Sequence, residues 1–231
     1  MSTDRAPFWR NRFWRRWIAA NALGELLGLG TVAAIGFFVF QSAGEPSSTG
    51  RVLGFAAVFI FLGGFEGLII GLAQRHVLRS LFPSVRGWVL ATIVGAVVAW
   101  TIGMVPSTVA SLLHQGDTSA QVQPPLALVL LLAAGLGAVA GPLLAAFQWL
   151  SLRKVLPSKA WLWLPANALA WAIGMPVIFL GAQSNEFTSS ATIIAALVAM
   201  AILVAGAAIG AVHGRVLLGL VQGGASGKNA A

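Results

Sequence analysis

Two glutamates, Glu25 and Glu66, are the residues whose positions most clearly indicate chemistry. Both interrupt long apolar stretches, Glu25 eight residues after Trp17 and Glu66 eight residues before Gln74. In a helical hairpin running out and back, both would lie about 12 Å from the same interface. An ionised carboxylate facing lipid costs roughly 2.5 kcal/mol or more, so an acid in such a stretch is a candidate functional group. Two acids at one depth can share a proton or hold a cation, and we expect at least one to be protonated at neutral pH. The alternative role is a protonated, hydrogen-bonded contact between helices.

A second set of polar residues lies near the same end of the apolar stretches. Its members are Asn21, Gln74, Gln148, Asn167 and His213. If the faces that carry them meet at the centre of a bundle, they form a polar ring that lines a vestibule. The alternative is that each side chain hydrogen-bonds across helices, a contact worth about 0.6 kcal/mol on average.

The sequence carries no signature of an enzyme, a metal site or a cofactor. It has no cysteine, which excludes thiolate ligands and a cysteine nucleophile. It contains no G-x-S-x-G, phosphate-binding loop or H-E-x-x-H motif. His76 and His213 do not occupy equivalent positions, so a haem-ligating pair is not expected. We therefore predict a non-enzymatic protein that needs no cofactor.

The elements that must position these residues are transmembrane helices. Of the 231 residues, 58% are hydrophobic and only 9% are charged, too few to cover a water-facing surface. Polar breaks divide the chain into six apolar runs: 17–40, 52–73, 88–113, 126–147, 161–182 and 191–212. Crossing about 30 Å of hydrocarbon takes about 20 helical residues. The runs do not alternate as barrel strands do, so we predict an all-α, polytopic membrane protein with six transmembrane helices.

Basic residues mark one side of the membrane. Of the 14 Lys and Arg residues, all except Arg51 lie at the termini or in the second and fourth loops. The excess of positive charge in cytoplasmic loops places both termini in the cytoplasm, here of a bacterial plasma membrane. The net charge of +8 then indicates anionic lipid as the partner and gives no reason to expect nucleic acid.

An internal repeat groups the six helices into three hairpins, at about 17–84, 88–158 and 161–222. The second helices align as Gly67-x3-Gly71-x2-Gln74, Gly141-x3-Ala145-x2-Gln148 and Gly206-x3-Gly210-x2-His213. The first helices align as Trp17-x3-Asn21-x3-Glu25, Thr92-x3-Ala96-x3-Trp100 and Trp163-x3-Asn167-x3-Trp171. Units of two helices share one orientation, which predicts tandem parallel repeats with pseudo-threefold symmetry about the membrane normal. The small residues of the second helices, spaced four apart, predict close helix packing.

Three segments complete the predicted organisation. Residues 1–16 form a basic and aromatic cytoplasmic segment, residues 17–222 the transmembrane domain, and residues 223–231 a flexible cytoplasmic tail. Arginine interleaved with aromatic residues is typical of a segment that lies in the headgroup layer. The residues expected to anchor the chain at the membrane surface are Trp9, Arg10, Arg12, Trp14, Arg15, Arg16 and Trp17. Trp88, Trp149, Trp161 and Trp163 are expected to extend this aromatic belt.

Two recurring motifs resemble those of a known group. Gln74-x3-Leu78-Arg79-x3-Pro83 recurs at 148–157, and Trp-x-Ile-Gly-Met occurs at 100–104 and 171–175. This pattern resembles small multi-pass bacterial membrane proteins built from repeated hairpins, and the resemblance covers most of 17–220. It implies the fold and attaches no activity, ligand or catalytic residue.

Two functions agree with these observations. The first is a membrane scaffold, sensor or accessory subunit that acts through helix packing and contact with a membrane-protein partner or a second copy of itself. The alternative is a small transporter or channel that uses Glu25 and Glu66 as a proton or cation site. A water-accessible cavity that reaches the acids favours transport, whereas a dry, glycine-packed core favours the scaffold.

Overall fold

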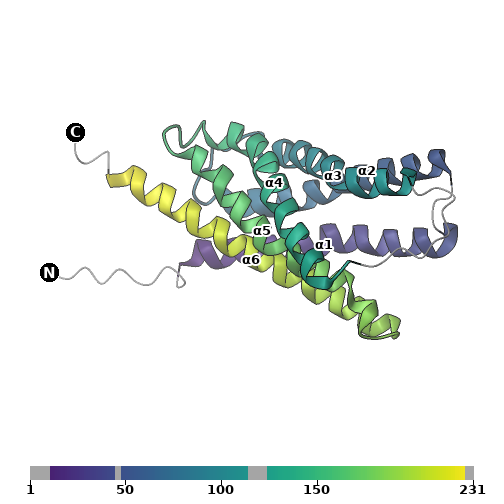
Figure 1. Cartoon of the computed structure of the whole chain (residues 1–231). Coiled ribbons are helices and arrows are strands. Elements are labelled where there is room, and N and C mark those ends of the chain that lie inside the picture. Colours follow the sequence, from purple (N-terminus) through teal and green to yellow (C-terminus); the bar gives the residue numbers. More distant parts are fainter. Residues whose placement is uncertain (1–10, 45–47, 114–123, 227–231) are drawn as a thin grey trace.

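Six long helices make up the described part of the protein (Figure 1). The computed structural model describes residues 11–44, 48–113 and 124–226, and within these ranges all regular secondary structure is helical. The helices are α1 (Arg12–Ala43), α2 (Thr49–Leu78), α3 (Trp88–Leu113), α4 (Leu126–Leu152), α5 (Trp163–Ala182) and α6 (Ala191–Ser226). Two short 3-10 helices, η2 (Ala160–Leu162) and η3 (Ser184–Glu186), flank α5.

Each of the six helices is long and apolar enough to cross a membrane. The prediction of an all-α protein with six helices that could span a membrane is therefore confirmed. The outer helices extend beyond the apolar runs, because α1 begins at Arg12 and α6 continues to Ser226. The Asn11 side chain caps α1 by accepting hydrogen bonds from the backbone N–H groups of Phe13 and Trp14. Hydropathy locates the lipid-crossing part of a helix, whereas such caps decide where the helix starts.

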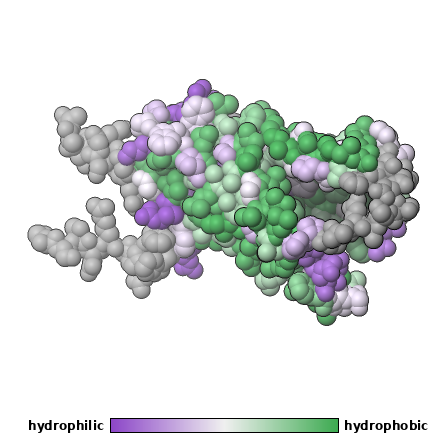
Figure 2. All heavy atoms as spheres, in the orientation of Figure 1, coloured by the Kyte–Doolittle hydropathy of each residue, from purple (hydrophilic) through white to green (hydrophobic). Residues whose placement is uncertain are grey.

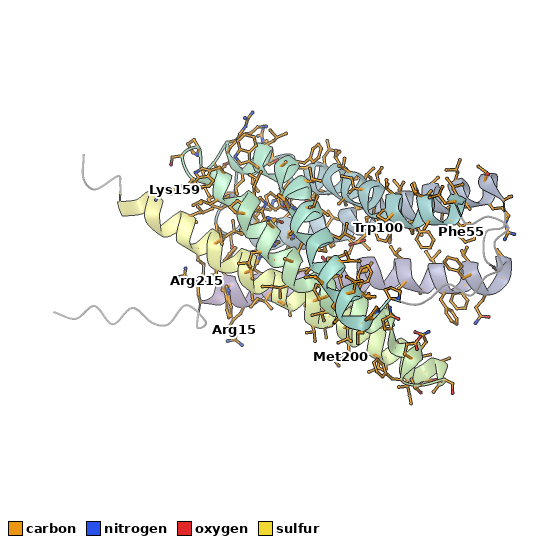
Figure 3. All side chains as sticks on the ribbon, viewed as in Figure 1. Arg15, Phe55, Trp100, Lys159, Met200 and Arg215 are labelled. Carbon is orange, nitrogen blue, oxygen red and sulfur yellow. The ribbon has the colours of Figure 1, made fainter. Side chains whose placement is uncertain are left out.

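The helices form a closed ring. Each packs against the next along the chain, and α6 packs against α1. The start of α1 and the end of α6 lie at one end of the bundle (Figure 1), which we call the terminal end. Arg15, Lys159 and Arg215 also lie at this end, whereas Phe55 lies toward the opposite one (Figure 3).

The surface around the middle of the bundle is apolar. Figure 2 shows hydrophobic atoms over the central part of the visible face and hydrophilic atoms gathered toward its ends. Large apolar side chains point outward, such as Phe61 with 77% of its surface exposed and Leu131 with 68%. Exposed apolar area of this extent suits a lipid environment.

Small residues allow three of the helix pairs to approach closely. A Cβ atom on Gly67 would lie 2.7 Å from the Cβ of Ala96, so α2 meets α3 there. One on Gly141 would lie 2.5 Å from the Asn167 carbonyl oxygen of α5. The remaining small residues of the predicted packing set are Gly71, which faces α3, Ala145, which is fully buried on α4, and Gly206 and Gly210, which face α1. Larger side chains at these positions would force the backbones apart.

Candidate functional site

Three tryptophans fill the ring at its terminal end. Trp17 of α1, Trp88 of α3 and Trp163 of α5 have no exposed surface. Their ring centroids lie 5.8 to 6.5 Å apart in edge-to-face geometry, an arrangement favoured between aromatic rings. Phe13 stacks on Trp17 from outside, with centroids 5.8 Å apart. We call Trp17, Trp88 and Trp163 the tryptophan cluster.

The tryptophan cluster corrects the expected membrane-surface role of Trp17. The Trp17 ring packs against two other indoles in the core, so it cannot lie among lipid headgroups, and the same holds for Trp88 and Trp163 in the expected belt. Trp14 is half-buried and donates from Nε1 to the Ala211 carbonyl of α6 at 3.0 Å. Of the other expected anchors, Arg12, Arg15 and Arg16 are exposed, whereas Trp9 and Arg10 lie outside the described residues.

A layer of hydrogen-bonded polar side chains lies one helical turn further in. Asn21, Thr92 and Asn167 each donate to the carbonyl of the tryptophan four residues earlier, at 2.8, 2.9 and 2.8 Å. Gln74 of α2 donates to Asn21 at 2.9 Å and accepts from Trp88 at 3.1 Å. Gln74 thereby joins α2 to both α1 and α3 through side-chain hydrogen bonds.

Gln148 of α4 repeats this bonding pattern. It donates to Thr92 at 3.0 Å and to Gln74 at 3.3 Å, and it accepts from Trp163 at 2.9 Å. The expected alignment of Thr92 with Trp17 is therefore wrong by one turn, because Trp88 packs with Trp17 and Thr92 bonds as Asn21 does. Sequence reasoning missed Thr92, although the spacing Trp88-x3-Thr92 matches Trp17-x3-Asn21 and was available as a signal.

His213 of α6 lies at the remaining position of this layer without hydrogen bonds. Its ring centroid lies 4.7 Å from that of Trp163, and both ring nitrogens are buried without a partner among the described residues. The Trp17 Nε1 and Asn167 Oδ1 atoms are likewise buried and unpartnered. The unsatisfied atoms thus gather where α1, α5 and α6 meet. A buried polar group without a partner costs about 1–3 kcal/mol, so this third of the layer is suboptimal for stability.

Glu25 and Glu66 lie beyond the polar layer, Glu25 about one turn after Asn21 and Glu66 about two turns before Gln74. Only 1% of Glu25 and 6% of Glu66 is exposed, and both side chains line the same small chamber. Trp100 Nε1 donates to Glu66 Oε2 at 2.8 Å. Glu25 Oε2 is buried with no partner among the described residues. Both acidic side chains are thus buried inside the bundle.

Two cavities adjoin the acids. A small chamber of about 20 Å³ lies between the polar layer and the acid pair, and Asn21, Glu25, Glu66 and His213 are among the residues that line it. Its volume suits roughly one water molecule. No Lys or Arg is among the residues that line either cavity. Among the described residues, His213 is the one basic side chain that lines a cavity next to the acids.

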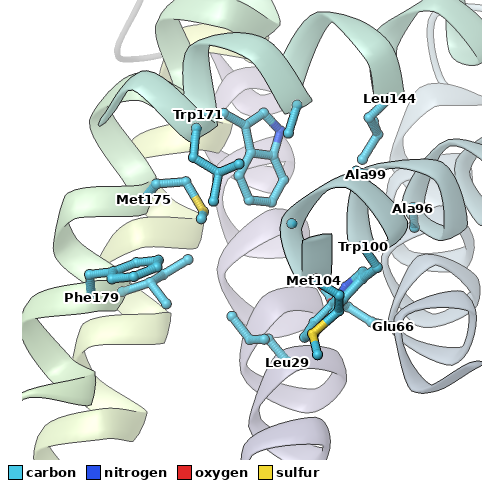
Figure 4. A pocket seen from close by; sticks show the side chains of 14 residues that line it. Leu29, Glu66, Ala96, Ala99, Trp100, Met104, Leu144, Trp171, Met175 and Phe179 are labelled. Atoms are coloured by element: carbon cyan, nitrogen blue, oxygen red, sulfur yellow. The ribbon is translucent and has the colours of Figure 1, made fainter. Parts of the chain in front are cut away.

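The second cavity is much larger and lies on the other side of Glu66. It has a volume of about 300 Å³, and its walls are mainly apolar (Figure 4). Its lining includes one acidic, three aromatic and two thioether side chains: Glu66, Trp100, Trp171, Phe179, Met104 and Met175. Glu66 and Trp171 border both cavities. The site is thus an apolar cavity that ends on an acid pair, followed by a polar layer and the tryptophan cluster.

Comparison with known proteins does not extend this description. No family model matches the chain, and no curated protein and no solved structure is significantly similar to it.

Proposed function

We propose that the protein is a small carrier or channel of the bacterial plasma membrane in which Glu25 and Glu66 form a proton or cation site. One observation carries the proposal: Glu66 borders both the large cavity and the small chamber that contains Glu25. An acid that exchanges protons or cations needs such access, whereas an acid that only joins two helices does not. The unpartnered Oε2 of Glu25 adds a free acceptor to the site.

The proposal includes an orientation with both termini in the cytoplasm. Arg15, Lys159 and Arg215 lie at the terminal end (Figure 3), and cytoplasmic loops carry the excess of positive charge. In this orientation the tryptophan cluster closes the cytoplasmic side, and the large cavity lies toward the outside. The exposed arginines at the start of α1 would contact anionic lipid.

We also propose that the ring consists of three tandem hairpins related by a pseudo-threefold axis along the membrane normal. Support comes from two matched pairs of hydrogen bonds. Trp88 to Gln74 matches Trp163 to Gln148, and Gln74 to Asn21 matches Gln148 to Thr92. In this arrangement Glu25 corresponds to Ala96 and Trp171, and Glu66 to Ala140 and Ala205. Only the first hairpin then supplies acids, so the site is single and off the axis.

The experiment is proton flux into liposomes that contain the purified protein, followed with an entrapped pH-sensitive dye. We expect flux with the wild type and its loss in Glu25→Gln and in Glu66→Gln, while both variants keep near-wild-type thermal stability because glutamine preserves size and hydrogen bonding. Glu186→Gln, at an exposed position of η3, is the matched control and should leave flux unchanged. Wild-type flux in both acid variants would refute the proton site.

A scaffold or accessory subunit is the second candidate. The close packing of Gly67, Gly141 and Gly206 against neighbouring helices favours it, because such seams rigidify a bundle. This function predicts no flux for any variant and a stoichiometric membrane-protein partner in a pull-down from mild detergent.

A further inference from the structure

We propose that the 300 Å³ cavity binds a small lipophilic organic cation, with Glu66 as its counter-ion and Trp100 and Trp171 as aromatic walls. This inference rests on the proposed function and names the class of substrate that the carrier would take. It follows from the size, the charge and the lining chemistry of the cavity.

The size of the cavity suits one small molecule. Ligand sites commonly measure about 300–1,000 Å³ and have mostly apolar walls with a few convergent polar groups. This cavity, at about 300 Å³, lies at the lower limit. It therefore fits a ligand of about one aromatic ring with a compact substituent and excludes bulky amphiphiles.

The charge of the cavity selects the sign of the ligand. Among the described residues that line the cavity, Glu66 is the only one with an ionisable side chain. Trp100 fixes the carboxyl group through its 2.8 Å hydrogen bond without supplying positive charge. An acid pair that holds one proton carries a single negative charge, which one monovalent cation neutralises. An anion would instead meet this charge in apolar surroundings.

The remaining lining selects the type of cation. Ca²⁺ takes about 6–8 oxygen ligands and Mg²⁺ about six, whereas this cavity offers the oxygens of one carboxylate. A sugar would leave most of its hydroxyl groups without partners. The rings of Trp100, Trp171 and Phe179, together with the thioethers of two methionines, suit a cation whose charge is spread over apolar groups, because such cations bind aromatic faces.

The experiment measures binding of benzyltrimethylammonium to the purified full-length protein by equilibrium dialysis. Two probes of matched size serve as controls: neopentylbenzene, which replaces the nitrogen by carbon, and benzenesulfonate, which reverses the charge. We expect saturable binding of the cation alone. Glu66→Gln should weaken it at least about 10-fold through loss of the charge-assisted contact, and Glu186→Gln should leave it unchanged. Equal binding of neopentylbenzene would overturn the proposal in favour of a neutral apolar ligand.

A second variant keeps the proposal falsifiable if Glu66→Gln fails to fold. Ala140 lines the cavity, so Ala140→Phe should fill it and abolish binding without changing any charge. Undiminished binding to a folded Ala140→Phe protein would place the cation elsewhere and refute the site. Flux and binding fail separately: binding without proton flux supports the cation site and refutes proton transport, whereas proton flux without binding refutes the cation site alone.

Discussion

The substitution His213→Gln should stabilise the protein. Glutamine at this position can accept from Trp17 Nε1 and donate to Asn167 Oδ1, as Gln74 and Gln148 do with their own neighbours. Both of these atoms are buried and unpartnered in the wild type. Two hydrogen bonds contribute about 1 kcal/mol each, so the free energy of unfolding should rise by about 2 kcal/mol. For a chain of this size, about 2–4 °C in Tm accompanies each kcal/mol, which gives a rise of about 4–8 °C.

The assay is thermal unfolding in mild detergent, followed by circular dichroism. The matched control is Gln74→His, which removes the acceptor for Trp88 and the donor to Asn21 and should lower the Tm by a similar amount. A lower Tm for His213→Gln, or an unchanged Tm for Gln74→His, would refute the reasoning that His213 is the weak third of the polar layer. Loss of flux together with a raised Tm would show that His213 is kept for activity at the expense of stability.

Two further predictions concern packing and topology. Gly210→Leu should lower the Tm by several degrees, because a Cβ at this position would lie 2.9 Å from the Ile18 Cα atom. Gly54→Leu is the control, since nothing lies within 4 Å of its Cβ position. Equal Tm values for the two variants would indicate that α1 and α6 are loosely packed. Because the chain has no cysteine, single introduced cysteines can report topology. Asn185→Cys should react with a membrane-impermeant maleimide in intact cells, and Lys159→Cys should react only after lysis. The reverse labelling pattern would contradict the proposed orientation.

The sequence predicted the helices well because apolar length is a local property. Each apolar run became one helix, and Glu25 and Glu66 came together because their distances from one interface could be counted along the chain. The ends of the helices were less predictable. Asn11 starts α1 through a side-chain cap, a feature that hydropathy does not report.

The site itself was only partly predictable, because it depends on which side of each helix faces inward. Tryptophan suits both a lipid interface and a protein core, so composition did not distinguish the two environments for Trp17, Trp88 and Trp163. Thr92 was overlooked because its short side chain does not resemble Asn, although it supplies the same hydrogen bonds. The large cavity depends on how side chains such as Trp100 and Trp171 fill the ring, which residue spacing alone does not determine.

The contact between α6 and α1 has a consequence for how this chain can be connected. Since α6 packs against α1 without being covalently linked to it, the ring of helices is closed by packing alone. The chain could therefore start and end between another pair of neighbouring helices. The start of α1 and the end of α6 lie at the same end of the bundle (Figure 1), so a linker there could join these two helices. New termini could then open at Gly87, between α2 and α3, giving a circular permutant with the same helix neighbours. In such a protein the acid-bearing hairpin would be synthesised last. Comparing it with the wild type would show whether the order in which the hairpins enter the membrane affects folding, because the final helix arrangement is the same.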